Sequence, residues 1–163
     1  MKTYTHNTHR NAAFTLIEIL IVVVILGILA AVVIVQISGM RTDAERAAFI
    51  SSAQIFQEAA YRFYLDNGVY PRNRRSGRLP DGFGDYVTSH SWERRTPIDG
   101  LWDMEADSYG LTSSLGVHFK NGSGNRKDDA YMREIDAIID DGDLDTGVFR
   151  KLAGRRYYFV IAE

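Results

Sequence analysis

The sequence predicts an α+β fold in which one long N-terminal helix packs on a small antiparallel β-sheet domain. Three observations lead to this fold. An unbroken apolar run extends from Ile19 to Val35, and fourteen of its seventeen residues are Ile, Leu or Val. Beyond it, apolar residues recur at helical spacing as far as Phe63. Short β-type runs separated by turn residues then fill the second half of the chain.

The apolar run predicts a membrane-spanning helix. A helix over residues 14–35 is roughly 33 Å long at about 1.5 Å per residue, enough for a hydrocarbon core of about 30 Å. Fourteen side chains at about −0.3 to −0.6 kcal/mol each outweigh about +3 kcal/mol for Glu18. We therefore expect residues 14–37 to span the membrane as the first half of a helix over 14–67. Lys2 and Arg10 precede this span, so the positive-inside rule predicts a cytoplasmic N-terminus and a soluble domain outside the cytoplasm.

A secretory signal peptide and a plain membrane anchor are alternative interpretations of this segment. The apolar run exceeds the 7 to 15 residues usual in a signal peptide, and no clear A-x-A site follows it. Neither alternative explains Glu18, because an ionisable residue inside an apolar segment is costly and marks a function with a specific partner. The carboxylate of Glu18 is therefore the first candidate functional group.

The run Ala13-Phe14-Thr15-Leu16-Ile17-Glu18, followed by the apolar stretch, resembles the N-terminal signature of type IV pilins and type II secretion pseudopilins. The resemblance implies that residues 1–13 are a basic leader, which a prepilin peptidase removes on the cytoplasmic side. The cut then lies between Ala13 and Phe14, and the new amine of Phe14 is methylated. The family usually has glycine before the cut, whereas this chain has Ala13.

The same resemblance implies a structural filament subunit of pilin-like fold, namely a pseudopilin of a type II secretion system. Such a subunit waits in the inner membrane as a single-pass protein with its soluble domain in the periplasm or outside the cell. An inner-membrane platform then assembles it with copies of itself and other pilin-like subunits. The alternatives are a type IV pilus pilin for adhesion, motility or DNA uptake, and a monomeric membrane-tethered binding domain.

The physical chemistry of Glu18 agrees with assembly. A carboxylate among bundled apolar helices costs several kcal/mol unless a cation compensates it, and the amine of Phe14 on a neighbouring subunit is such a cation. That pairing favours one axial stagger between subunits. The alternative is a carboxylate that reaches the lipid headgroup region.

The helical pattern continues through apolar residues that we expect to face the domain core. Asp66-Asn67-Gly68 ends the helix, because Gly68 suits a left-handed cap and Pro71 prevents continuation. The core candidates of this segment are Ala48, Phe49, Ile55, Phe56, Ala59, Ala60 and Phe63.

Residues 68–163 are expected to form a small globular α+β domain with three or four antiparallel strands. Trp92 and Trp102 are interpreted as core or loop anchors, with a carbohydrate or protein recognition surface as the alternative. A short helix is expected over Asp129 to Asp140, before Gly142. The strand candidates are Leu101–Met104, Tyr109–Leu111, Val117–Phe119 and Tyr157–Ile161.

One acidic turn suggests a metal. Asp141, Asp143 and Asp145 offer carboxylate oxygens at the spacing that begins an EF-hand loop, but position twelve is Leu152 rather than an acid. Some type II secretion pseudopilins bind calcium near their C-termini, so the resemblance implies Ca²⁺ as a possible ligand here. The alternative is a solvated turn whose charges nearby arginines compensate.

Other function classes have little support. No cysteine is present, which excludes disulfides and thiolate metal sites. Without residues 1–13 the formal charge is 17 − 21 = −4, so a general nucleic-acid binder is not expected, although the basic segment Arg72–Arg78 offers a local patch. No nucleophile elbow, zinc-helix motif or phosphate loop occurs, and we expect no enzyme.

Overall fold

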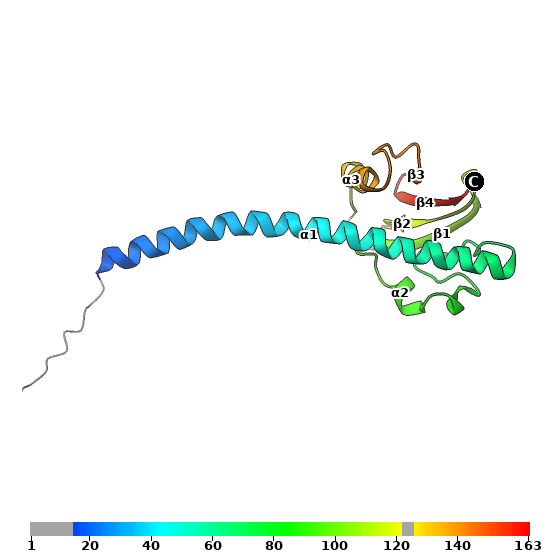
Figure 1. The fold of residues 1–163 in the computed structure, drawn as a ribbon, viewed down its shortest axis with the longest axis horizontal. Helices are drawn as coiled ribbons and strands as arrows, with labels where there is room; N and C mark the ends of the chain where they lie inside the picture. Colours follow the sequence, from blue (N-terminus) through cyan, green and yellow to red (C-terminus); the bar gives the residue numbers. More distant parts are fainter. Residues whose placement is uncertain (1–14, 122–125) are drawn as a thin grey trace, which may run out of the picture. The chain divides into compact units, whose positions relative to one another are not determined.

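The long N-terminal helix is the first element of the computed structural model, which describes residues 15–121 and 126–163. Helix α1 extends from Leu16 to Asn67 without interruption (Figure 1). It passes through two compact units, residues 1–41 and 42–163. Its length and its C-terminal end agree with the helix expected over 14–67.

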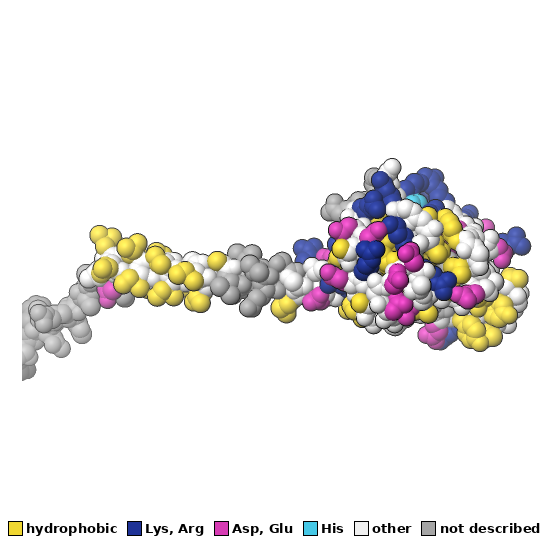
Figure 2. All heavy atoms as spheres, turned by 90° about the horizontal axis from the view of Figure 1, so that it is seen from above, with side chains coloured by type: hydrophobic (Ala, Val, Ile, Leu, Met, Phe, Trp, Pro, Cys, Tyr) yellow, Lys and Arg dark blue, Asp and Glu magenta, His cyan; other side chains and the backbone are white. Residues whose placement is uncertain are grey.

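In the first unit, every large apolar side chain from Leu16 to Leu29 is more than half exposed. Figure 2 shows these hydrophobic side chains along the described N-terminal part of the helix. Within the described residues, no helical stretch combines the length and the hydropathy that a membrane crossing requires.

In the second unit, one face of α1 is buried at helical spacing. Phe49, Ala53, Phe56, Ala60 and Phe63 recur at intervals of three and four residues and are nearly or fully buried. Two residues expected in the core lie on the solvent-exposed face of the helix instead: Ala48 is exposed, and Ile55 is 60% exposed. Ala53, which the sequence analysis omitted, takes the inward position.

The end of α1 follows its sequence signals. Gly68 has φ +71, and its amide donates to the Tyr64 carbonyl at 2.8 Å, so the chain leaves the helix through a left-handed residue. Asn67 Nδ2 caps the Phe63 carbonyl at 2.8 Å. The predicted stop at Asp66-Asn67-Gly68 is confirmed.

Four antiparallel strands form one sheet of order β1-β2-β4-β3. The strands are β1 (Leu101–Ser108), β2 (Leu111–His118), β3 (Phe149–Ala153) and β4 (Arg156–Ala162). The sheet and its antiparallel sense were predicted, whereas β3 was not. Tyr109 lies in the turn between β1 and β2 rather than in a strand of its own.

The core lies between α1 and one face of the sheet, and aromatic rings dominate it. Phe49 stacks on Trp102 at 5.4 Å, and Phe56 meets Trp102 edge-on at 4.9 Å and Trp92 at 5.2 Å. Trp92 and Trp102 are both nearly or fully buried, which confirms them as core anchors. Each such ring contributes burial energy and a further ~0.5–1.5 kcal/mol per ring pair.

The described residues of the second unit also form three short helices. A 3₁₀ turn (Phe83–Asp85) and α2 (Ser89–Glu93) place Phe83 and Trp92 in the core, and neither helix was predicted. The expected helix near the C-terminus is α3 (Asp129–Ile139), where Asp128 caps the amide of Tyr131 at 2.9 Å. A cation–π contact between Arg46 and the Tyr131 ring, with 4.5 Å from Cζ to the centroid, joins α3 to α1.

Candidate functional site

The start of α1 holds the first candidate site. Ala13 and Phe14, the residues of the expected cut and methylation, lie outside the described residues. Glu18 is described, and its Oε2 accepts from the Thr15 amide at 2.9 Å and from the Thr15 hydroxyl at 2.8 Å. The Glu18 amide in turn donates to Thr15 Oγ1 at 3.3 Å. This reciprocal pair is a capping box.

The capping box adds Thr15 to the residues that act on the Glu18 carboxylate. Sequence reasoning missed Thr15, although the T-x-x-E spacing of residues 15–18 was a sufficient signal. Two donors on one residue hold the carboxylate at the helix N-terminus, where the macrodipole also favours a negative charge. The carboxylate is thus hydrogen-bonded within its own chain, on a helix whose large apolar side chains from Leu16 to Leu29 are exposed.

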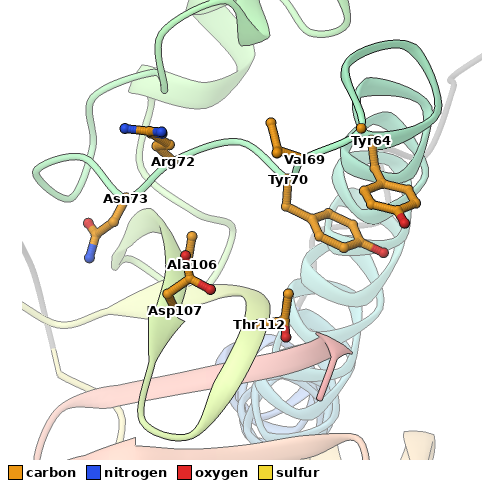
Figure 3. Close-up of a pocket in the computed structure, with 9 residues that line it drawn as sticks. Tyr64, Val69, Tyr70, Arg72, Asn73, Ala106, Asp107 and Thr112 are labelled. Carbon is orange, nitrogen blue, oxygen red and sulfur yellow. The ribbon is translucent and has the colours of Figure 1, made fainter.

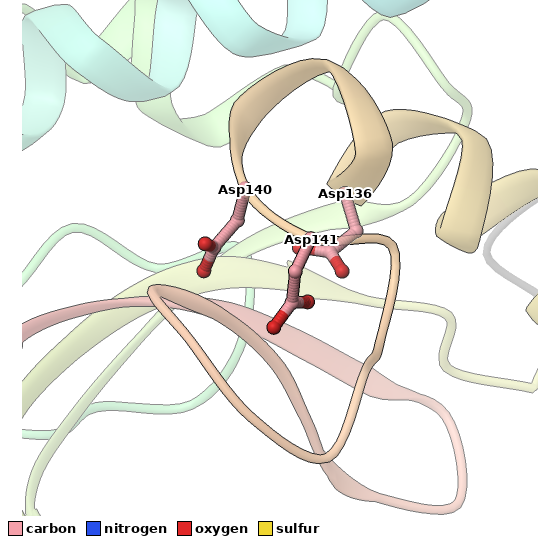
Figure 4. A group of neighbouring side chains, drawn as sticks. All are labelled: Asp136, Asp140 and Asp141. Carbon is pink, nitrogen blue, oxygen red and sulfur yellow. The ribbon is translucent and has the colours of Figure 1, made fainter.

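A cluster of three aspartates at the end of α3 is the second candidate site (Figure 4). Asp136, Asp140 and Asp141 each place a carboxylate oxygen within 4.8 Å of the others. Asp136 is fully buried, and neither of its carboxylate oxygens has a hydrogen-bond partner among the described residues. Burial, together with the charges of Asp141 and Asp140, raises the pKa of Asp136 to about 6.

The turn after α3 is ordered by its own carboxylates. Asp141 accepts from the Asp143 amide at 2.8 Å and from the Thr146 hydroxyl at 2.9 Å, and these bonds lower the pKa of Asp141. Asp143 accepts from the Asp145 amide at 3.1 Å. Asp140 accepts from the Val148 amide at 2.5 Å.

The expected calcium ligands are therefore only partly brought together. Of Asp141, Asp143 and Asp145, only Asp141 belongs to the cluster that approaches one point. The other members are Asp140 from the same turn and Asp136 from α3. Carboxylate oxygens in this density are the donors that a hard cation takes, and a buried carboxylate without hydrogen bonds lacks the compensation that such a cation supplies.

A third cluster lies on the sheet face opposite α1, where the segment around Ser76 covers the sheet. Asp103 is 1% exposed, and its Oδ2 accepts from the Tyr158 hydroxyl at 2.7 Å, Arg156 at 2.8 Å and Ser76 at 3.0 Å. Arg156 also bonds Glu105, the second buried acid of β1. Burial raises the pKa of Asp103 to about 6 despite these donors.

Ser76, His118 and Asp103 are the residue types of a hydrolase triad, but their order is different. Ser76 Oγ lies 2.7 Å from His118 Nδ1, and Asp103 Oδ2 lies 3.7 Å from the same nitrogen. In a triad the acid and the nucleophile approach opposite ring nitrogens. This cluster ties the segment around Ser76 to the sheet and offers no support for nucleophilic catalysis.

The basic segment Arg72–Arg78 is partly neutralised within the chain. Arg74 pairs with Asp81 at 2.6 Å, and Arg78 lies 3.5 Å from Glu93. Because these guanidinium groups already have acids, the segment presents fewer unpaired cations to a phosphate backbone than its sequence suggests.

The chain is similar to several known proteins. Residues 8–34 match the family model described as the prokaryotic N-terminal methylation motif. The chain is 36% identical over 125 residues to the type II secretion system core protein G of Pectobacterium carotovorum subsp. carotovorum, covering 72% of this chain and 76% of that protein. It is 29% identical over 148 residues to the type IV major pilin protein PilE of Neisseria gonorrhoeae, covering 82% and 87%.

A solved structure shows the same fold. The major type IV pilin PilA1 from Clostridium difficile superposes with a TM-score of 0.52 at 16% identity, covering 77% of this chain and 99% of that chain. At this identity the likeness concerns the fold, a long N-terminal helix with an antiparallel sheet.

Proposed function

The chain belongs to the type II secretion system core protein G family and is a pseudopilin subunit, and from this premise we propose how its N-terminus drives assembly. Residues 1–13 are removed by a prepilin peptidase and Phe14 is methylated. The processed subunit then joins a filament of its own copies and other pilin-like subunits. The methylation motif over residues 8–34 supports the processing step.

One observation carries the assembly proposal: Glu18 lies in the first turn of an apolar helix, with its carboxylate held by Thr15. The large apolar side chains from Leu16 to Leu29 are exposed in the single subunit. Lipid would shield them from water before assembly, and the helices of other subunits would do so after it. In such a bundle Glu18 needs a cation, and the amine of Phe14 on a neighbouring subunit supplies it.

The proposed location follows from the same segment. Before assembly the subunit crosses the inner membrane once, with the leader in the cytoplasm and residues 68–163 in the periplasm. Lys2 and Arg10 before the apolar run support this orientation. A platform in that membrane then extracts the subunit into the filament.

The assembly proposal is tested with Glu18→Ala in cells that express the secretion system. Membrane insertion is expected to persist, because removing a carboxylate lowers the cost of insertion, whereas incorporation into filaments is lost. Glu58→Ala is the matched control, since Glu58 is an exposed acid of the same helix whose ion pair among the described residues is with Arg62. Filaments of normal length and yield from Glu18→Ala refute the assembly role.

Processing is tested by intact mass of the membrane-extracted protein. Loss of residues 1–13 with one added methyl group is the expected result. An unprocessed mass supports the competing class, a monomeric membrane-tethered binding domain, because a plain anchor needs no cut before Phe14.

We further propose that a hard divalent cation, Ca²⁺ by preference, binds at Asp136, Asp140 and Asp141. The buried, unpartnered carboxylate of Asp136 beside two more acids supports this ligand set over one centred on Asp143 and Asp145. The cation would supply the positive charge that these acids lack and would tie α3 to the turn that follows it. Calorimetric titration of the purified chain with calcium tests it, and absence of a saturable heat removes the cation from the proposal.

A further inference from the structure

A pocket of about 570 Å³ lies at the C-terminal end of α1, beside the segment that follows it and the β1–β2 hairpin. Figure 3 shows Tyr64 and Tyr70 on one side and Asn73, Ala106 and Asp107 on the other. The two tyrosine rings stack with centroids 4.6 Å apart and an interplanar angle of 16°. The volume falls within the range of about 300–1,000 Å³ usual for small-molecule sites.

Two charged side chains of opposite sign line this pocket and are not engaged elsewhere. Within residues 15–121 and 126–163, no hydrogen bond or ion pair involves the Arg72 guanidinium or the Asp107 carboxylate. Arg74 and Arg78, two and six residues beyond Arg72, do have acidic partners. The pocket therefore combines flat aromatic surface with one free donor group and one free acceptor group, at zero net charge.

The backbone at Asp107 is held in a costly conformation. Asp107 has φ +51 and Tyr109 has φ +56, and both are non-glycine residues in the left-handed region. Such residues cost on the order of 1 kcal/mol each and persist where the surrounding structure fixes them. Asp107, one of these two residues, lines the pocket.

We propose that this pocket binds a neutral pyranose saccharide, in addition to the subunit's part in a filament. The apolar face of a pyranose ring packs on a tyrosine ring, and its neighbouring hydroxyls accept from Arg72 and donate to Asp107. A nucleotide fits less well, because its phosphates meet one cation and a carboxylate. A wholly apolar ligand would desolvate both charges without replacing their water.

The test titrates the full chain in detergent micelles with two neutral trisaccharides, maltotriose and chitotriose, followed by saturation-transfer NMR and calorimetry. Saturable binding at one site with Kd on the order of 1 mM is expected for an open pocket. Arg72→Gln and Asp107→Asn should each weaken binding by about tenfold or more, because each removes a charge-assisted hydrogen bond. Asparagine tolerates the left-handed conformation, so Asp107→Asn changes charge with little effect on the turn.

Arg75→Gln is the matched control, because Arg75 is an exposed arginine of the same segment outside the pocket. Its binding should equal that of the unmodified chain. The proposal is overturned if neither trisaccharide binds saturably, if Arg75→Gln weakens binding as much as Arg72→Gln, or if ADP binds this pocket more tightly. Filament assembly by Arg72→Gln is expected to be normal, so failure of the saccharide site and failure of the assembly role are told apart.

Discussion

His118 Nδ1 and Asp103 Oδ2 lie 3.7 Å apart, and Ser76 Oγ contacts both atoms. Burial raises the pKa of Asp103 to about 6. Burial, with the charges of Arg156, Lys120 and Arg155, lowers the pKa of His118 to about 4. The folded protein therefore favours the neutral form of both partners, and their shifts act in opposite directions on stability.

The shifted pKa values of Asp103 and His118 predict how the stability of the folded protein depends on pH. The raised pKa of Asp103 gives stability that is present below about pH 4 and is lost as pH rises to about 6. The lowered pKa of His118 gives stability that is present above about pH 6.5 and is lost as pH falls to about 4. The two contributions largely cancel, so the thermal midpoint should change little from this pair across that window.

Single variants should separate these contributions. Because Asp136 titrates in the same window, each variant is compared with the unmodified chain: acidification from about pH 6.5 to 4 should lower the thermal midpoint further in Asp103→Asn and should raise it in His118→Asn. Circular dichroism melts at several pH values measure both slopes. Equal slopes in the two variants would contradict the opposed titration.

Arg156 is predicted to be essential for the stability of the sheet. Arg156→Met leaves Asp103 and Glu105 buried without their shared cation, which should cost about 3–5 kcal/mol of unfolding free energy. Arg62→Met is the control, because its pair with Glu58 is about two-thirds exposed and should cost about 0–1 kcal/mol. Chemical denaturation measures both unfolding free energies. Similar losses in the two variants would show that the buried ion pairs of Arg156 stabilise the fold no more than an exposed ion pair does.

A glycine in the centre of the sheet sets how closely two strands approach. A Cβ at Gly116 would lie 2.0 Å from the Tyr157 carbonyl oxygen, whereas a Cβ at Gly154 would meet nothing within 4 Å. We expect Gly116→Ala to destabilise the protein by about 3 kcal/mol or more and Gly154→Ala by less than about 0.5 kcal/mol. Thermal melts compare the two, and an unchanged midpoint in Gly116→Ala would be inconsistent with this packing.

Calcium is predicted to stabilise the protein through Asp136. Saturating calcium should raise the thermal midpoint of the unmodified chain and of Asp145→Asn, because ligand binding stabilises the folded state by mass action. The increase should disappear in Asp136→Asn, which should also be more stable than the unmodified chain without metal, since a buried unpartnered carboxylate is removed. Loss of the calcium effect in Asp145→Asn instead would favour the ligand set expected from sequence.

Thr15 is predicted to position Glu18 for assembly. Thr15→Ser keeps both donors to the carboxylate and should keep filament yield, whereas Thr15→Val removes the hydroxyl at similar size and should lower it severalfold. The yield is measured on sheared filaments relative to the membrane pool. Equal yields from the two variants would show that the Thr15 hydroxyl has no part in assembly.

The helix and the sheet were predictable because their signals are local. The apolar run, the spacing up to Phe63 and the cap at Gly68 lie within the segments that they shape. Strand β3 was missed because Arg150 and Lys151 interrupt its apolar pattern. Its residues form a strand by pairing with β4, and this pairing is not visible in the local sequence. The strand expected over Leu101–Met104 is shorter than β1, and β2 was expected only at its two ends, within Tyr109–Leu111 and Val117–Phe119. Asp103 and Glu105 lie in β1 as buried acids because the segment around Ser76 covers them, which is a contact between distant parts of the chain.

The candidate sites were predictable to different degrees. Glu18 stood out as a charge in an apolar run, and Thr15 could have been found from the capping-box spacing. Asp136 was missed, although it follows Ile135 on the face that also carries Met132, and both of those residues are fully buried. An acid on the apolar face of a short helix was the available signal. The saccharide pocket needed the fold, because Tyr70 and Asp107 are brought together only by the sheet and the helix end.

The capping box at Thr15 and Glu18 bears on the traffic of subunits between membrane and filament. The carboxylate already has two donors from its own chain, so under the proposed assembly it would keep these two hydrogen bonds while it gains a cation from a neighbouring subunit. The internal hydrogen bonds would be the same in a free subunit and in an assembled one, so the capping box by itself favours neither state.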